Sequence, residues 1–406
     1  MTTAQLGEIS SIVRGIAFPK EDKRAEPLPG HVACLRTTNV QRTVEWDDLW
    51  FVPEKHVKRE EQLVRSGDIL ISTANSYELV GKVAPVVGIP HKATLGAFIS
   101  LIRPNERVEP KFLYHQLAWG KTQSRIRETA STTTNISNVS TKKLLTLEMF
   151  TPPLEAQREI VAELEKQFSR LDEAVANLQR VKANLKRYKA SVLKAAVEGR
   201  LVETEGGWRK STLGEEGSII GGLTKNQKRN DLPLKLPYLR VANVYANELR
   251  LDEIEYIGVA ERELEKLLVR KGDLLLVEGN GSPDQIGRVA LWNDAIPNCV
   301  HQNHLIKARF GGAVFPEWAL IWMLSPVGRH GIERVSASTS GLHTLSVGKV
   351  SRLPIGVPSL KEQVSIVAEV DRHLSIIREV ETEVDTNLHR AQAMRQSTLH
   401  RAFTET

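Results

Sequence analysis

The chain has 406 residues, enough for two or more domains that each bury a core of their own. Its 55 Lys and Arg against 49 Asp and Glu give a net charge of +6, which is compatible with nucleic-acid binding but far from a polybasic tail. Two cysteines, Cys34 and Cys299, are too few for a disulfide framework or a cysteine metal site, and they fit a reducing cytoplasm.

Membrane and secretory segments are not expected. Polar residues follow Met1 in place of a basic and then apolar signal, and no run approaches the roughly eighteen apolar residues of a membrane helix. We therefore expect a soluble, cytoplasmic protein with no membrane partner.

Residues 1–153 alternate short apolar runs with turn residues. Gly67 and Asp68 precede the run Ile69–Ser72, and a Gly-Asp turn feeding such a run predicts a tight entry into a buried strand. Pro110 opens a helical pattern, in the first turn where helices tolerate proline. Strands interrupted by helices predict an α+β globular domain.

A long helix is predicted to begin just after Pro153 and to end at Gly199, within a helical spacer region at 154–205. Apolar residues recur every seven positions along it, which is typical of a helix that pairs with another helix. The main row consists of Leu164, Leu171, Leu178, Leu185 and Val192, and intermediate positions are filled by Ala174, Val181, Tyr188 and Ala195.

The second half of the chain repeats the first, about 205 residues later. Leu35–Val40 returns as Leu239–Val244, and Val64–Leu70 returns as Val269–Leu275. A duplicated module is therefore predicted rather than a short-period solenoid. It places a second globular domain at 206–357 and a second helical region at 358–406, whose apolar row is Val370, Ile377, Val384 and Ala391.

Each helix would be roughly forty residues, or about 60 Å long, too long to bury its apolar row in one domain of this size. We expect the two helices to pack as an antiparallel coiled coil, which would place the two globular domains at its opposite ends. The alternative is that each helix folds back on its own domain.

Searches for catalytic motifs are negative. The sequence from Thr151 to Leu154 has the two prolines of an amino-methyltransferase loop, but it lacks the Asn and the aromatic residue that such a loop needs. The loop at 279–284 lacks the third glycine of a dinucleotide site, and no phosphate-binding loop occurs. Cys299, His301 and His304 lack a second ligand pair, so no metal site is expected.

Three motifs occur in order in both halves. They are a helix entry (Pro152–Val161 and Val357–Gln363), a helix exit (Lys189–Ala196 and Gln396–Phe403) and a small-hydroxyl stretch (Ser131–Ser137 and Ser338–Leu342). Together with the duplication, they make the whole chain resemble the specificity subunit of type I restriction-modification systems. In that family two variable target-recognition domains alternate with two helical spacers.

The resemblance implies a non-catalytic DNA-recognition subunit. Each globular domain would read one half of a bipartite, asymmetric target in double-stranded DNA, and the helices would set the spacing and dock two modification (methyltransferase) subunits. Restriction (translocase and nuclease) subunits would join them. The resemblance places no cofactor in this chain, whereas S-adenosylmethionine, ATP and Mg²⁺ would be bound by the partner subunits.

Candidate DNA contacts are Lys, Arg and small polar residues in turns, since such side chains bind phosphates and base edges. They form four regions in each copy. In the first copy they are Arg14, Lys20, Lys23 and Arg24; then Thr37 and Asn39; then Thr73, Asn75 and Ser76; then Arg125, Thr132, Thr133, Thr134 and Asn135. In the second copy they are Lys225, Asn226, Lys228 and Arg229; then Asn243; then Asn280, Ser282 and Gln285; then Arg334, Ser338, Thr339 and Ser340.

The first region is expected to contact phosphates. Arg36 and Arg240 recur in both copies, which favours a role in the shared fold over a role in reading one half-site. The loop after Ser72, one residue longer in the second copy, is the preferred specificity element. A coiled-coil scaffold that joins protein partners without touching DNA is the alternative function, and salt-dependent DNA affinity distinguishes the two.

Overall fold

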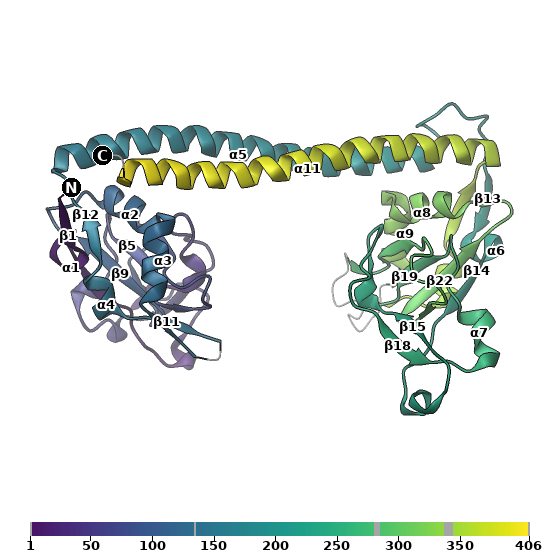
Figure 1. The fold of residues 1–406 in the computed structure, drawn as a ribbon, viewed down its shortest axis with the longest axis horizontal. Helices are drawn as coiled ribbons and strands as arrows, with labels where there is room; N and C mark the ends of the chain where they lie inside the picture. Colours follow the sequence, from purple (N-terminus) through teal and green to yellow (C-terminus); the bar gives the residue numbers. More distant parts are fainter. Residues whose placement is uncertain (1, 134, 280–284, 337–343, 405–406) are drawn as a thin grey trace. The chain divides into compact units, whose positions relative to one another are not determined.

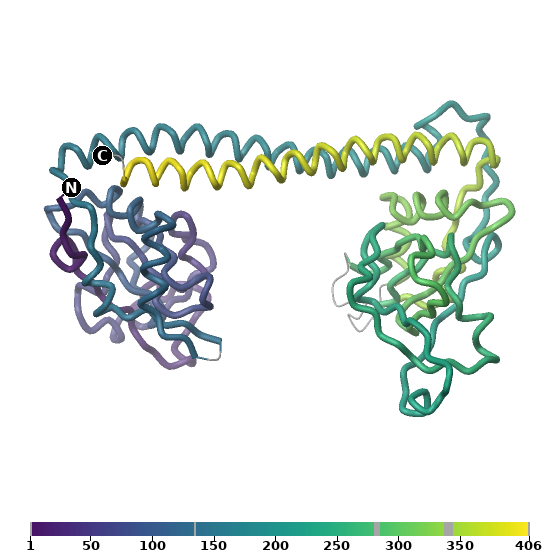
Figure 2. The backbone as a smooth tube through the Cα atoms, viewed as in Figure 1, coloured from purple at the N-terminus to yellow at the C-terminus, as the bar shows by residue number. Residues whose placement is uncertain are grey.

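The computed structural model describes residues 2–133, 135–279, 285–336 and 344–404, and the chain divides into two compact units (Figure 1). Unit 1 comprises Met1–Leu178 together with Thr386–Thr406, and unit 2 comprises Gln179–Asp385. Both ends of the chain therefore belong to unit 1, as the tube in Figure 2 shows. The long helices α5 (Leu154–Val197) and α11 (Leu360–Thr404) each contribute one part to unit 1 and the other part to unit 2.

Unit 1 is built on a four-stranded sheet with the order β2-β9-β5-β7, accompanied by a three-stranded sheet, β4-β3-β8. A second three-stranded sheet, β10-β11-β6, and the pair β1-β12 complete it. Its strands are β1 (Thr3–Gln5), β2 (Ser10–Arg14), β3 (His31–Leu35), β4 (Trp50–Pro53), β5 (Ile69–Ser72), β6 (Ala74–Asn75), β7 (Val83–Pro85), β8 (Ala93–Leu95), β9 (Ile99–Pro104), β10 (Ala130–Thr132), β11 (Ser137–Val139) and β12 (Glu148–Phe150). Its short helices are α1 (Leu6–Ile9), α2 (Pro110–Ala118), α3 (Gly120–Glu128) and α4 (Thr141–Leu145), with single 3₁₀ turns at Lys20–Asp22, Thr37–Asn39, Glu54–His56 and Glu60–Gln62.

Unit 2 repeats this plan. Its four-stranded sheet has the order β14-β22-β19-β20, its three-stranded sheet the order β18-β15-β21, and β13 pairs with β23 as β1 pairs with β12. Its strands are β13 (Arg209–Thr212), β14 (Gly217–Gly221), β15 (Lys235–Leu239), β16 (Val244–Tyr245), β17 (Glu248–Leu249), β18 (Glu255–Gly258), β19 (Leu274–Val277), β20 (Val289–Leu291), β21 (Val300–His301), β22 (Leu305–Phe310) and β23 (Pro354–Val357). Its short helices are α6 (Leu213–Glu216), α7 (Glu261–Leu267), α8 (Pro316–Leu324), α9 (Pro326–Ser336) and α10 (Val347–Ser351), with 3₁₀ turns at Gln227–Asp231 and Val241–Asn243.

The Gly-Asp turns predicted before the buried strands are present in both units. Gly67 and Gly272 have φ of +87° and +91°, a left-handed conformation that glycine adopts without strain. The carboxylate of Asp68 then accepts two hydrogen bonds from Arg103, both at 2.8 Å, and one from the Arg65 backbone N–H at 2.7 Å. The sequence motif thus marks a buried ion pair that fastens β5 to β9.

The equivalent pair in unit 2 has the same geometry. Asp273 accepts from Arg309 Nε and Nη2 at 2.6 and 2.7 Å, and from the Arg270 backbone N–H at 2.8 Å. Both carboxylate side chains are 1% exposed. Because a carboxylate buried this deeply is stable only with its cation, the motif constrains two strands at once.

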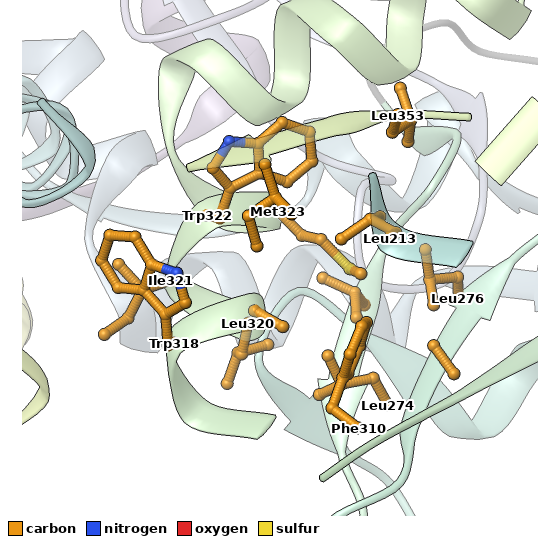
Figure 3. Close-up of a cluster of buried hydrophobic side chains, with 14 of the residues drawn as sticks. Leu213, Leu274, Leu276, Phe310, Trp318, Leu320, Ile321, Trp322, Met323 and Leu353 are labelled. Carbon is orange, nitrogen blue, oxygen red and sulfur yellow. The ribbon is translucent and has the colours of Figure 1, made fainter. Parts of the chain in front are cut away.

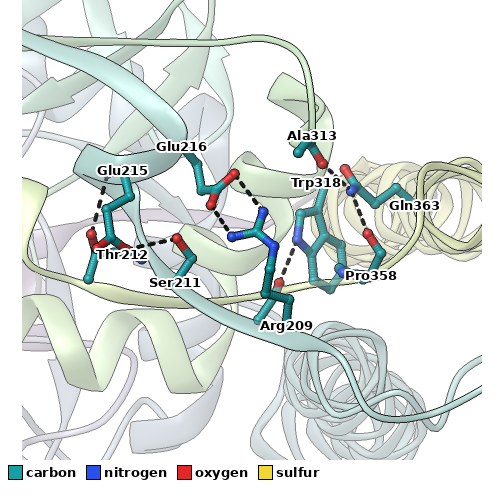
Figure 4. Close-up of polar contacts among 10 residues, drawn as sticks. Arg209, Ser211, Thr212, Glu215, Glu216, Ala313, Trp318, Pro358 and Gln363 are labelled. Atoms are coloured by element: carbon teal, nitrogen blue, oxygen red, sulfur yellow. Dashed lines mark hydrogen bonds and ion pairs between the residues drawn. The ribbon is translucent and has the colours of Figure 1, made fainter.

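Each long helix is anchored to its globular part by a buried glutamine. Gln363 donates from Nε2 to the carbonyls of Ala313 and Pro358, at 2.7 and 2.9 Å (Figure 4). Its side-chain oxygen accepts from the N–H of Phe315 at 2.8 Å. Gln157 makes the same three kinds of contact in unit 1. These glutamines belong to the helix-entry motif that recurs in the sequence.

The two long helices pack against each other in antiparallel fashion within each unit. In unit 1, Arg395 contacts Asp172 at 3.0 Å and Thr398 contacts Gln167 at 3.3 Å, so the residue numbers run in opposite directions. In unit 2, Lys182 pairs with Asp385 at 2.7 Å. The predicted fold class, α+β domains with two long helices packed as an antiparallel coiled coil, is confirmed.

The helices also pack on the globular parts, so the two alternatives drawn from the sequence are combined. In unit 1, Leu164 of α5 and Leu399 and Phe403 of α11 share one apolar cluster with Phe112 of α2. In unit 2, Val192, Val370 and Ile377 join the cluster that surrounds Trp318 and Trp322 of α8 (Figure 3). Each globular core is therefore closed by segments of both helices.

All nine residues of the predicted main rows are buried or half-buried: Leu164, Leu171, Leu178, Leu185, Val192, Val370, Ile377, Val384 and Ala391. The predicted intermediate row is wrong over much of its length, because Val181 and Tyr188 are 39% and 46% exposed and Ala174 is exposed as well. The second buried row follows the first by four residues, as at Phe168, whose ring lies 5.4 Å from that of His115. After Leu164, Val192 and Val370, which pack against the globular parts, the residue four positions later is buried and the residue three positions later is not.

The two compact units divide both long helices, between Leu178 and Gln179 and between Asp385 and Thr386. This division into two units differs from the four regions predicted from the sequence. The boundaries of those four regions stay a prediction. Among the helices of the described ranges, none is both long and apolar enough to cross a bilayer.

The Asp68–Arg103 pair gives a first prediction. Asp68→Ala removes a buried carboxylate and leaves its guanidinium unpaired, so we expect the free energy of unfolding of unit 1 to fall by about 3–5 kcal/mol. Urea unfolding of the full chain measures it. The matched control is Glu106→Ala on the surface of the same unit, which should change stability by less than about 0.5 kcal/mol. Equal effects of the two substitutions would contradict the structural role of the pair.

Two buried histidines give a second prediction. Burial lowers the pKa of His301 in unit 2, and of His115 in unit 1, from 6.5 to about 4. Between pH 6.5 and 4 the unfolded chain therefore binds protons that the folded chain does not, so stability falls as pH falls through this window. From pH 7 to pH 5 each histidine should cost about 2 kcal/mol.

The measurement is urea unfolding at both pH values. His301→Leu should remove its share of the loss, whatever it does to stability at pH 7. The control His389→Leu lies on the exposed side of α11 and should leave the pH dependence unchanged. A pH dependence that is the same in His301→Leu and the unmodified chain would refute the assignment.

Candidate nucleic-acid interface

Two of the four predicted DNA-contact regions meet in one small sheet of unit 1. Strand β6, which follows Ser72, pairs with β11, and β11 pairs with β10. Asn75 lies opposite Ser137, so the preferred specificity loop is joined to the small-hydroxyl stretch. Thr132 bonds to Ser137 at 2.9 Å and the N–H of Thr133 donates to the Ile136 carbonyl at 2.9 Å, which fixes this hairpin.

A turn at Phe98 connects this sheet to the other two regions. The backbone N–H groups of Thr73 and Ala74 both donate to the Phe98 carbonyl, at 2.9 and 3.1 Å. Phe98 also lines an open cavity of about 540 Å³, together with Lys20, Lys23 and Thr37 from the first and second regions. The first and second regions thus line a cavity with the Phe98 turn, the third region bonds to this turn through its backbone, and the fourth region joins through the pairing of β11 with β6.

The Trp50 ring holds two cations at the rim of this cavity. The Lys23 ammonium lies 3.4 Å from the centre of the Trp50 ring, and the Arg36 guanidinium carbon lies 4.4 Å from the same centre. Arg36 also pairs with Asp48 at 2.5 Å, a contact that belongs to the fold of the loop. Lys20 is exposed at the rim, and an exposed lysine next to held cations attracts an anionic partner.

Asn39 and Asn243, both predicted as DNA contacts, lie inside the fold and not on its surface. Both are 2% exposed. The amide of Asn39 donates to the carbonyls of Glu45 and Asp47 and accepts from the N–H of Arg36, and Asn243 makes the equivalent three bonds. These asparagines recur because each closes a loop, which is a structural role like the one predicted for the recurring arginines.

Several predicted arginines are engaged within the protein. Arg229 forms a two-pronged ion pair with Glu263 at 2.9 and 3.0 Å, with its side chain 13% exposed. Arg125 donates to the Glu148 carbonyl on β12, beside α11 rather than beside the small-hydroxyl stretch. Arg14 donates to Thr141 at 2.8 Å, and Arg24 bonds to backbone carbonyls of its own turn.

The equivalent surface of unit 2 has a different character. Lys225 pairs with Glu255 at 2.9 Å, and Arg240 pairs with the same carboxylate at 2.6 Å. The bond from Lys225 lowers the pKa of Glu255 below its usual range. Asn226, Lys228, Gln285 and Arg334 are exposed. Predicted residues Thr134, Asn280, Ser282, Ser338, Thr339 and Ser340 lie outside the described residues.

The aromatic side chains of the interface were not predicted. Phe98 is 63% exposed, and Phe18 and Trp50 are half-buried in the cavity wall. A signal was available, since Phe98 follows Gly96 in a short turn between two apolar runs, where an aromatic residue has no core to enter. A pattern of charged and small polar residues alone does not include an aromatic residue at this turn.

The cysteine thiols and the Lys307 ammonium, which are reactive groups in many enzymes, have structural surroundings in this protein. Among the described residues, no cluster of three or more His, Cys, Asp or Glu is placed to hold a metal ion. Burial raises the pKa of both Cys34 and Cys299 to about 12, which keeps the thiols protonated and unreactive. The pKa of Lys307 is lowered by burial to about 8, and its ammonium donates to the carbonyls of Lys266 and Leu268 at the end of α7.

The chain is similar to known proteins over nearly its whole length. It is 26% identical to the EcoKI type I restriction enzyme specificity subunit of Escherichia coli K12 over 412 residues, covering 98% of this chain and 88% of that protein. It is 25% identical to the StySPI specificity subunit of Salmonella potsdam over 413 residues, covering 99% and 88%. A family model described as the type I restriction modification DNA specificity domain matches residues 1–186.

Solved structures show the same fold. A chain from a structure on complex assembly and conformational transition of the type I R-M system matches with a TM-score of 0.74 at 18% identity, covering 99% of this chain and 97% of that chain. The HsdS subunit of Thermoanaerobacter tengcongensis matches with a TM-score of 0.52 at 18% identity, covering 99% and 96%. By its sequence relatives and its duplicated fold, the chain is similar over nearly its whole length to the specificity subunits of type I restriction-modification systems, which are non-catalytic DNA-recognition subunits.

Proposed function

We propose that unit 1 and unit 2 each bind one half of a bipartite, asymmetric DNA target. The observation that carries this proposal is that parts of all four regions, among them Lys20, Thr37 and Asn75, lie around the Phe98 turn of unit 1 or on the small sheet bonded to it. Unit 2 has the same strand order in its four-stranded sheet and in the three-stranded sheet β18-β15-β21, with different side chains at the equivalent surface. A shared fold with divergent surfaces suits two half-sites of different sequence.

Within this interface, we assign phosphate contacts to the exposed basic residues and base reading to the small sheet. Lys20 of unit 1 and Lys228 of unit 2 are exposed, as phosphate contacts require. Asn75, Ser76, Thr133 and Asn135 lie on or beside the β10-β11-β6 sheet and offer the amide and hydroxyl groups that recognise base edges.

We further propose that α5 and α11 set the distance between the two half-sites and dock two methyltransferase subunits. Apolar side chains that the helix pair leaves uncovered support docking. In unit 2, Val181, Tyr188 and Ile376 are 39%, 46% and 46% exposed, and in unit 1 Met394 is 58% exposed. Restriction subunits, S-adenosylmethionine, ATP and Mg²⁺ belong to the surrounding complex in this proposal, which we place in the cytoplasm.

A third prediction tests the target directly. Cells that express this chain with its cognate modification subunit should carry adenine methylation at one split, asymmetric motif, which sequencing of methylated adenines detects. The motif should be absent when this chain is omitted. An active modification subunit whose methylation never depends on this chain would favour the protein-scaffold alternative.

The same measurement assigns the two halves. Asn75→Ala in unit 1 should relax or change one half of the motif and leave the other half intact. The comparison is Gln285→Ala, which replaces an exposed residue of the corresponding loop of unit 2 and should affect the opposite half. Changes in the same half for both variants would contradict one half-site per unit.

A fourth prediction concerns phosphate contacts. Lys20→Ala should weaken binding to every DNA sequence about equally and reduce the slope of log affinity against log salt concentration by about 1, because one phosphate contact is lost. Lys20→Arg keeps the charge and should keep most of the slope. Fluorescence anisotropy of labelled duplexes across a salt series measures both. A slope that is the same in Lys20→Ala would exclude this lysine from the contacts.

A further inference from the structure

The aromatic residues that line the open cavity of unit 1 are replaced at the equivalent described positions of unit 2. Strand register identifies the equivalent positions. Trp50 lies opposite Cys34 between β4 and β3, and Glu255 lies opposite Tyr238 between β18 and β15. Trp50 in unit 1 is therefore replaced by Glu255 in unit 2.

The same reasoning applies to the other two rings of the cavity. Ile16 bridges to Gly96 as Leu223 bridges to Gln302. Counting two residues along each segment pairs Phe18 with Lys225, and Phe98 with His304. The equivalence of Phe98 and His304 is supported by their carbonyls, which accept from the N–H groups of Thr73 and Glu278, both at 2.9 Å.

The three replacements change what this place can hold. In unit 1, Phe18, Trp50 and Phe98 line an open cavity of about 540 Å³ with mostly apolar walls. In unit 2, the first two positions carry the ion pair between Lys225 and Glu255, 2.9 Å apart, which Arg240 extends. The fold is the same, but the aromatic pocket of unit 1 is replaced in unit 2 by a cluster of charged side chains that form ion pairs with one another.

The aromatic rings and lysines of the unit 1 pocket suit a ligand that has a planar group next to a negative charge. Phe98 is 63% exposed, and two hydrogen bonds to its carbonyl fix the backbone of the turn that presents its ring. Lys23 is held against Trp50, and Lys20 stands exposed at the rim. A nucleotide has a planar base that stacks on aromatic rings and a phosphate that pairs with lysine.

We propose that this pocket receives one base unstacked from the half-site bound by unit 1. The base lies against Phe98 and the flanking phosphate contacts Lys20 and Lys23. This rests on the proposed function, and it adds a mode of recognition that unit 2 lacks. The occupant is a nucleotide of the DNA strand, and a free mononucleotide is the other source of the same chemistry.

Mispaired duplexes test the proposal. The duplexes carry the motif found by methylation sequencing, with one mispair at each position of the unit 1 half in turn and the methylated adenine always left paired. At one position the mispair should tighten binding about tenfold, because the cost of unpairing the base is already met. At the other positions mispairs should weaken binding or leave it unchanged.

Matched variants connect this gain to the pocket. Phe98→Ala should abolish the gain, and its exposed position makes a folding defect unexpected; Phe98→Tyr should retain it. The control His304→Ala changes the equivalent turn of unit 2 and should retain the full gain. A further control adds millimolar deoxyadenosine monophosphate or thymidine monophosphate as a competitor. Because a free nucleotide is not the proposed occupant, the competitor should act equally on Phe98→Ala and on the unmodified chain.

Three results would overturn the proposal: no mispair in the unit 1 half tightens binding, the gain survives in Phe98→Ala, or free mononucleotides displace the matched duplex in a manner that depends on Phe98. Failure of the proposed function looks different. In that case the unmodified chain in its complex does not bind even the fully paired motif more tightly than unrelated DNA, and the pocket proposal falls with it.

Discussion

Neither globular part closes its own hydrophobic core, and the rest of the structure depends on this constraint. The cluster of unit 1 includes Leu164 near the start of α5 and Leu399 and Phe403 near the end of α11. The cluster of unit 2 needs Val192 from the end of α5 and Val370 from the start of α11. Each core is completed by two helix segments that are far apart in sequence, which is why the long helices are antiparallel and why both must be present.

Comparison of the two copies of the fold shows which structural features are shared and which surface residues differ. Features that recur include the buried carboxylates of Asp68 and Asp273, the helix anchors Gln157 and Gln363, and the order of the strands. The surface around the Phe98 turn does not recur. A frame that tolerates an aromatic pocket in one copy and an ion-paired cluster in the other can change its ligand without repacking its core.

Much of the architecture could be predicted from the sequence because it depends on short-range patterns and on repetition. Gly67 with Asp68 marks a strand entry, Pro110 marks a helix start, and a seven-residue apolar row marks a pairing helix. The second buried row could not be predicted, since the choice between the third and the fourth residue depends on side chains such as His115 that are distant in sequence. The surroundings of the candidate site residues could not be predicted either. Residue type alone cannot distinguish exposed Lys20 from Arg229, which is held by Glu263, or from buried Asn39.

The place of the last helix in unit 1 has a consequence for how the protein is made. Synthesis proceeds from the N-terminus, and domains generally fold as units while the chain emerges. Residues up to Leu178 leave the ribosome long before Leu399 and Phe403, which pack against Phe112 in the finished core. Unit 1 must therefore keep apolar surface uncovered until the codons for Leu399 and Phe403 have been translated. A ribosome that stops early in α11 releases a chain whose first domain is the incomplete one.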